Sequence, residues 1–157
     1  MAVGTRGEPS VAEQVERASH ALMNISVRSL TVLEGKVSMP QFRALVVLEE
    51  HGPLNVGVLA EALRIAVSSV SRMCDRLVAA GLVDRRNPPH SRREIVLTLT
   101  PAARRLLRNV ANRRRALIAE AMQTMPEQAQ LALLTGLTAF ADAAGQEQGP
   151  DQRHAAG

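Results

Sequence analysis

Hydrophobic positions recur at helical intervals along most of the 157-residue chain. Apolar residues spaced three and four apart predict helices over 10–33, 38–51, 55–63, 67–80, 101–122 and 126–144. Between the fourth and fifth of these the period changes, and residues 82–86 and 94–99 are predicted as short strands joined by the polar segment 87–93. The pattern therefore predicts a mainly α-helical fold with a small β-hairpin wing, in which four helices precede the hairpin and two follow it.

Helix-capping residues support the predicted helix starts. A side-chain oxygen before the first turn accepts a hydrogen bond from a backbone N–H that has no partner inside the helix. Residues of this type precede four of the helices: Ser10, Ser38, Asn55 and Thr100. The helix over 67–80 differs, because Ala66 stands at its cap position. Ser68 would cap this helix only if the helix began later.

The helix over 67–80 divides into two faces when each residue is advanced by about 100°. Its apolar half is predicted to pack inward: Val67, Val70, Met73, Cys74, Leu77 and Val78. Hydroxyls and arginines point the other way, with Asp75 among them: Ser68, Ser69, Ser71, Arg72 and Arg76. Small side chains permit close approach to a groove and arginine can reach guanine, so this face is predicted to contact DNA.

The basic charge of the chain is concentrated in its middle. The formal net charge is +4, but residues 64–115 carry thirteen arginines against three acids, a net of +10. The flanking segments 1–63 and 116–157 are acidic, with nets of −2 and −4. Such a block indicates a polyanionic partner. Four of its arginines face almost no local acid in the sequence, which favours phosphate contact: Arg85, Arg86, Arg92 and Arg93.

The order of elements predicts a winged helix-turn-helix, in which two short helices joined by a tight turn precede a β-hairpin. The long helices carry more apolar surface than so small a module can cover, so a homodimer is expected. Its symmetry would match a palindromic operator in double-stranded DNA. The expected division is a disordered start (1–9), a helical dimerisation region (10–37 and 101–144), a DNA-binding lobe (38–100) and a disordered tail (145–157).

The stretch PLNVGVLAEALRIAVSSVSRMCDRLVAAGLVDRR, followed by SRREIVLTLTPAARRLL, resembles the multiple-antibiotic-resistance regulator (MarR) family. The likeness covers about residues 10–144 in element order, and its specific motifs lie between Leu54 and Leu107. It implies a dimeric winged helix-turn-helix transcription factor, a ligand-responsive repressor that reads the major groove with the helix over 67–80. It also implies that Arg93 enters the minor groove while the other hairpin arginines hold phosphates.

The chain departs from the family pattern at two positions. Ser91 replaces the aspartate of the wing, so the ion pair with Arg93 that braces the wing is not expected. Ala66 replaces the usual Ser or Thr cap, at a cost of about 1 kcal/mol. Many relatives bind small anionic or aromatic molecules, and Arg17 and His20 are the candidate residues for such an effector. Ordinary surface or intersubunit contacts are the alternative for this pair.

Other kinds of chemistry find little support in the sequence. The chain has no convincing nucleophile–base pair, paired carboxylates or phosphate-cradling loop, so neither an enzyme nor a cofactor is expected. The four histidines lack metal-ligand spacing, so no metal site is expected. Without an apolar leader or a long apolar run, a cytoplasmic protein with no membrane partner is expected.

Two alternative functions stay open at this point. A redox- or metal-responsive regulator would use Cys74 or the histidines, although the angle of Cys74 places this residue on the inward half of its helix. A winged helix that binds another protein without DNA is the second alternative, and the net charge of +10 over residues 64–115 argues against it. Salt-dependent binding to duplex DNA separates a DNA-binding protein from such a protein-only module.

Overall fold

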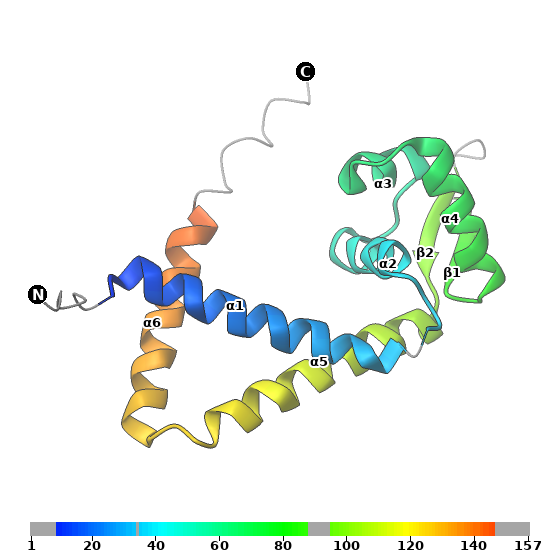
Figure 1. Cartoon of the computed structure of the whole chain (residues 1–157). Helices are drawn as coiled ribbons and strands as arrows, with labels where there is room; N and C mark the ends of the chain where they lie inside the picture. Colours follow the sequence, from blue (N-terminus) through cyan, green and yellow to red (C-terminus); the bar gives the residue numbers. More distant parts are fainter. Residues whose placement is uncertain (1–8, 34, 88–94, 147–157) are drawn as a thin grey trace, which may run out of the picture. The chain divides into compact units, whose positions relative to one another are not determined.

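The computed structural model of the chain describes residues 9–33, 35–87 and 95–146. The described elements follow the predicted order, so the fold class is confirmed (Figure 1). The elements are α1 (Val11–Ser29), the 3-10 turn η1 (Leu30–Leu33), α2 (Met39–His51), α3 (Val56–Leu63), α4 (Val67–Ala79), β1 (Val83–Arg86), β2 (Val96–Leu99), α5 (Pro101–Met122) and α6 (Glu127–Gln146).

Helix starts lie where the capping residues predict them. The Ser10 hydroxyl accepts a hydrogen bond from the backbone N–H of Glu13 at 3.2 Å, and the Asn55 side chain accepts one from Val58 at 2.9 Å. Ser38 forms a complete capping box with Gln41. Helix ends differ slightly from prediction. The α-helix of α1 ends at Ser29 and tightens into η1, and α6 runs two residues into the segment expected as a tail.

Contacts within the chain divide it into two units, Met1–Ala116 and Leu117–Gly157, and α5 crosses the boundary. The first unit holds the helices α1 to α4, the hairpin and most of α5. The second holds the last turns of α5 and the whole of α6. The division into a dimerisation region and a DNA-binding lobe is a functional one and stays a prediction. Among the described residues, no helix combines the length and the apolarity needed to cross a bilayer.

The core of the first unit lies where α2, α3, α4, the hairpin and α5 meet. Its fully buried large side chains come from every one of these elements: Leu45, Leu59, Leu77, Leu97, Val70, Val83 and Val110. Burying such side chains contributes about 1.5–3 kcal/mol each. This shared core fixes α4 against its neighbours and leaves one side of the helix to solvent.

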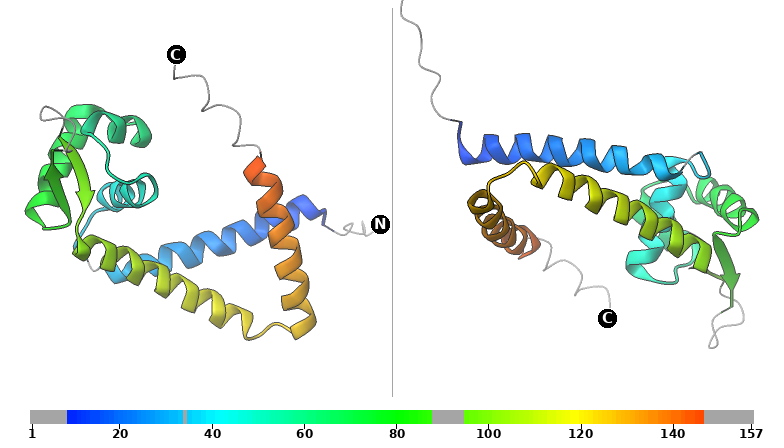
Figure 2. Two further views of the ribbon diagram at one scale, coloured as in Figure 1. Left: turned by 180° about the vertical axis from the view of Figure 1, so that it is seen from behind. Right: turned by 90° about the horizontal axis from the view of Figure 1, so that it is seen from below.

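The hairpin is antiparallel and pairs Val83 with Leu99 and Arg86 with Val96. A further bridge joins Leu54 to Leu97, which ties the hairpin to the segment before α3. The strands lie beside α4 in both Figure 1 and the view from behind (Figure 2, left). Since the backbone N–H of Leu82 donates to the carbonyl of Leu77 near the end of α4, β1 begins there and runs back toward the start of the helix.

Two residues of the predicted inward face of α4 lie in solvent, and this corrects the sequence analysis. Val70, Met73, Cys74 and Leu77 are buried, but Val67 is 55% exposed and Val78 is 36% exposed. Val67 belongs to the first turn and Val78 to the last. A helical wheel gives the direction of a face but not how far along the axis its packing partners reach. The core covers α4 from Val70 to Leu77 and leaves Val67, and more weakly Val78, at its margins.

Candidate nucleic-acid interface

The outward face of α4 carries the side chains that the sequence assigned to it. Ser68, Arg72 and Arg76 are exposed, and Ser69 and Ser71 are partly buried beside them. The first turn of the helix contains no acidic residue. The Arg72 guanidinium donates a hydrogen bond to the Ser69 hydroxyl at 3.5 Å, so it lies along the same face. The structure thus brings these five residues together on one accessible surface.

The start of α4 lacks a side-chain cap, as expected from Ala66. The N-cap is Ala66 itself, so the alternative that Ser68 caps a later helix start is wrong. A helix N-terminus without a cap leaves backbone N–H groups of its first turn open to an external acceptor. Phosphate oxygens are suitable acceptors, because the helix dipole also favours negative charge there.

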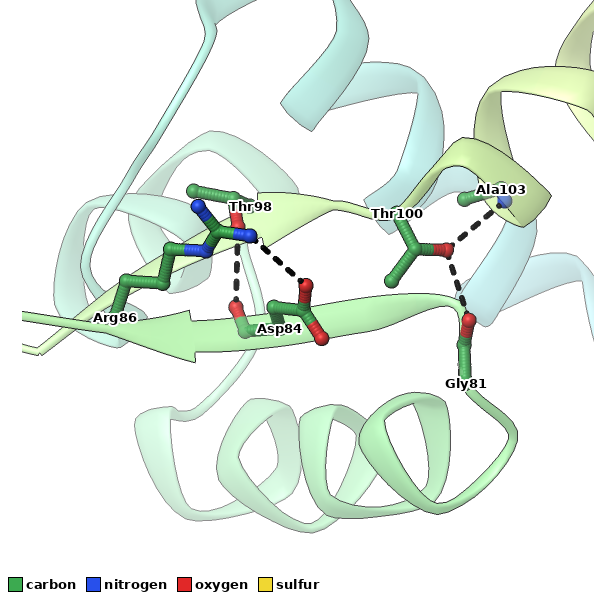
Figure 3. A network of polar contacts seen from close by, with 6 residues as sticks. All are labelled: Gly81, Asp84, Arg86, Thr98, Thr100 and Ala103. Carbon is green, nitrogen blue, oxygen red and sulfur yellow. Dashed lines mark hydrogen bonds and ion pairs between the residues drawn. The ribbon is translucent and has the colours of Figure 1, made fainter.

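Arg85 and Arg86 have acidic neighbours in the folded protein, contrary to the expectation of almost no local acid. Arg85 Nη2 lies 2.6 Å from Asp75 Oδ1, and Arg86 Nη2 lies 3.5 Å from Asp84 Oδ2 (Figure 3 shows the second pair). The first contact was missed because ten residues separate its partners. It arises because β1 runs back along α4, which brings Arg85 alongside the middle of the helix.

The Asp75–Arg85 ion pair connects α4 to the first strand of the hairpin. Its side chains remain 55% and 39% exposed, so it contributes less than about 1 kcal/mol to stability. It shows that β1 passes alongside the middle of α4. Of the two strand arginines, Arg86 is the more open, with 70% of its side chain exposed. The wing residues Ser91, Arg92 and Arg93 lie outside the described residues.

A buried threonine joins the end of α4 to the start of α5 (Figure 3). The Thr100 hydroxyl donates a hydrogen bond to the Gly81 carbonyl at 2.8 Å and accepts one from the Ala103 backbone N–H at 3.2 Å. Thr100 therefore caps α5, as predicted, and also anchors the turn that ends α4. Gly81 adopts a φ of 68° in this turn, which a residue without a Cβ accommodates readily.

Cys74 lies inside the lobe rather than on its surface. It is fully buried and it is a free thiol. Burial raises the pKa of the Cys74 thiol above its ordinary value of 9.0, an effect that Arg85 opposes and Asp75 reinforces. A buried, protonated thiol reacts slowly, since the thiolate is the reactive form. The structure supports the core interpretation of this residue.

We expect Cys74 in the native protein to resist a disulfide reagent such as DTNB at pH 8, with labelling no faster than unfolding. The same protein in urea should react with one equivalent at once. Because the folded state holds the thiol proton more tightly, the free energy of unfolding should fall as pH rises above about 9. Fast stoichiometric labelling of the native protein would contradict the burial and revive the redox alternative.

Arg17 and His20, the candidate effector residues, are both exposed on α1. Surface hollows formed by described residues of the first unit include one of about 430 Å³ and one of about 170 Å³, and neither of these is lined by Arg17 or His20. The larger hollow is lined by four apolar residues and three polar or charged ones: Ala80, Leu82, Ala102, Leu106, Lys36, Arg105 and Asn109. Within the described part of the chain, no three His, Cys, Asp or Glu side chains form a group able to hold a metal ion.

Comparison with known proteins connects this surface to a family. Residues 37–95 match a family model described as MarR family. The crystal structure of RV1404 from Mycobacterium tuberculosis is 40% identical, with a TM-score of 0.73, over 90% of this chain and 99% of that chain. The HTH-type transcriptional repressor MdtR from Bacillus subtilis (strain 168) is 32% identical over 95 residues, which is 60% of this chain and 61% of MdtR.

A mutant of MepR from S. aureus bound to an oligodeoxyribonucleotide shares the fold. Its TM-score is 0.66 at 18% identity, over 87% of this chain and 99% of that one. The chain spans less than two thirds of the length of the curated transcriptional regulators it matches.

Proposed function

The chain belongs to the MarR family, and we propose on that premise that it is a sequence-specific DNA-binding transcriptional regulator. It acts as a repressor on a palindromic operator, which it binds as a homodimer. The helix α4 enters the major groove and the hairpin contacts the neighbouring backbone and minor groove. DNA-bound MepR and the repressor MdtR, which resemble this chain, support the proposal.

The observation that carries this proposal is the composition of the exposed face of α4. Arginines and small hydroxyls cover it, its first turn has no acid, and the stretch from Arg64 to Arg115 has a net charge of +10. Hot spots of protein–protein interfaces are enriched in Trp, Tyr and Arg and poor in Ser, whereas this face has no aromatic residue and presents three serines beside its arginines. Such groups suit phosphate and base edges.

Exposed apolar side chains support the homodimer, because a chain in isolation gains nothing by leaving them in water. In the first unit several of them lie along α1, where Val11 is 82%, Met23 is 62% and Val27 is 61% exposed. In the second unit they lie along α6, where Leu131 is 60% and Leu134 is 64% exposed. A second copy of the chain would cover both sets and place two α4 helices on one duplex.

A small anionic or aromatic effector is proposed to regulate DNA binding. Arg17 and His20 stay the candidates on α1, where both are accessible. The hollow of about 430 Å³ offers a second place for such a molecule, since Arg105 and Lys36 stand beside the apolar Leu82 and Leu106. A carboxylate on a small apolar body has the complementary chemistry.

Selection of bound genomic fragments, followed by titration of the best fragment at several salt concentrations, tests the function. We expect a specific duplex to be recovered, with an affinity that falls about 10³-fold or more between 50 and 200 mM salt if six or more phosphates are contacted. Sedimentation of the same samples should give two protein chains per duplex. An affinity independent of salt, with no enriched fragment, would leave the protein-binding alternative in place.

A further inference from the structure

Arg64 adopts a backbone conformation that an arginine rarely occupies. It forms the C-cap of α3 with φ 55° and ψ 44°, in the left-handed region. Every other described residue with positive φ is a glycine: Gly35, Gly52 and Gly81. Residues other than glycine are strained in this region because their Cβ atom approaches the following carbonyl oxygen. Arg64 is therefore the exception among the described residues with positive φ.

The internal contacts of Arg64 give no reason for an arginine there. Its backbone N–H donates to the carbonyls of Ala60 and Glu61, bonds that a glycine would make equally well. The side chain is exposed, and no ion pair or side-chain hydrogen bond joins it to another residue in the described part of the chain. The fold therefore bears the cost of the strained backbone and draws no visible benefit from the guanidinium group.

The position of Arg64 points to an external partner. It stands three residues before Val67, where the uncapped helix α4 begins. Because β1 starts near the end of α4 and runs back along it, the start of α4 and the end of β1 lie at the same end of the lobe (Figure 1). Arg72 and Arg86 are exposed on these two elements. Arg64 thus adds a third exposed cation at this end.

We propose that Arg64 contacts a DNA phosphate beside the groove that α4 enters, and that the strained conformation is retained for this contact. The inference rests on the proposed DNA-binding function. From the turn between α3 and α4, this guanidinium group would contact the sugar-phosphate backbone of the DNA rather than the base edges. It would therefore add affinity without sequence preference. Strain kept at a functional position in this way is a known exchange of stability for function.

Substitution at Arg64 should move stability and DNA binding in opposite directions. Arg64→Gly relieves the strain, so the thermal midpoint should rise by about 2 °C at equal protein concentration. The same change should weaken binding about fivefold for each protomer, and equally for specific and non-specific duplexes. The plot of log K against log salt should lose about 0.9 of its slope for each phosphate contact removed, about 1.8 for a dimer.

Three further variants make the test decisive. Arg64→Asn tolerates the left-handed conformation without the charge and should bind as weakly as Arg64→Gly, which excludes a loss caused by a flexible turn. Arg64→Lys keeps the charge and should retain most of the affinity. Arg28→Asn removes an exposed arginine from α1 and should leave the salt slope unchanged.

The results separate this inference from the function on which it rests. If the wild type shows salt-dependent duplex binding and Arg64→Asn matches it in affinity and slope, the phosphate contact is wrong while the DNA-binding function stands. If Arg64→Gly lowers the thermal midpoint, the strain argument is wrong. If the wild type binds no duplex at all, both proposals are overturned together.

Discussion

Arg72→Ala is expected to weaken binding of the cognate duplex about 100-fold. A well-oriented arginine contact with a base edge contributes about 1–3 kcal/mol. A loss of about 1.4 kcal/mol weakens binding about tenfold, and a dimer loses this contact twice, which gives about 100-fold. Arg72 is exposed on α4 and lies beside Ser69, with no acid in the first turn to neutralise it. A titration of labelled operator at fixed salt measures the change directly.

The loss should be specific to the operator. Arg72→Ala should bind a scrambled duplex nearly as well as the wild type, because arginine that reads a base contributes little away from its site. The thermal midpoint should be unchanged, since the side chain is not part of the core. Arg28→Ala on α1 is the matched control and should bind within about twofold of the wild type. Full operator affinity in Arg72→Ala would remove this residue from the interface.

Leu77→Ala is expected to lower the free energy of unfolding by about 3 kcal/mol. Leu77 is completely buried on the inner face of α4, and truncation of such a leucine loses both its transfer energy and the packing around the cavity left behind. Urea denaturation of the two proteins measures the difference, provided that protein concentration is held constant. DNA binding should weaken only as far as the native fraction falls.

Val67→Ala is the matched control for this core substitution. Both residues fall on the apolar half of α4 in the sequence, yet Val67 is 55% exposed. Its truncation should change the free energy of unfolding by less than about 0.5 kcal/mol, as surface substitutions usually do. If the two substitutions lowered the free energy of unfolding equally, α4 would have to be covered along its full length. The exposure of Val67 in the first turn would then be contradicted.

Local features of the chain were predictable because their causes lie within a few residues. The caps at Ser10, Ser38, Asn55 and Thr100 and the inward residues Val70 and Leu77 follow from hydrogen bonding and helical period alone. The ion pair between Asp75 and Arg85 does not, because it depends on the direction in which the strand leaves the helix. The exposure of Val67 depends on how far the packed neighbours extend.

The backbone conformation of Arg64 is another feature that could not be predicted from the sequence. A tight turn at 64–66 is evident from the sequence, but arginine gives no signal for a left-handed backbone, which is normally marked by glycine or asparagine. The candidate interface on α4 was predictable because polar and apolar positions separate by angle. The contact of Asp75 with Arg85 was not, since it pairs a helix residue with a strand residue ten positions away, whereas Asp84 lies only two positions from Arg86 in the sequence.

The Thr100 hydroxyl has a mechanical consequence for the way an operator would be released. It bridges the Gly81 carbonyl and the first turn of α5 by two hydrogen bonds, so we expect a movement of this turn to be transmitted to the end of α4. In the proposed complex with DNA, a tilt of α5 at its start would therefore displace α4 relative to the major groove. The two α4 helices of a dimer must be spaced to match successive turns of the major groove. A small change in that spacing would therefore be enough to release the operator.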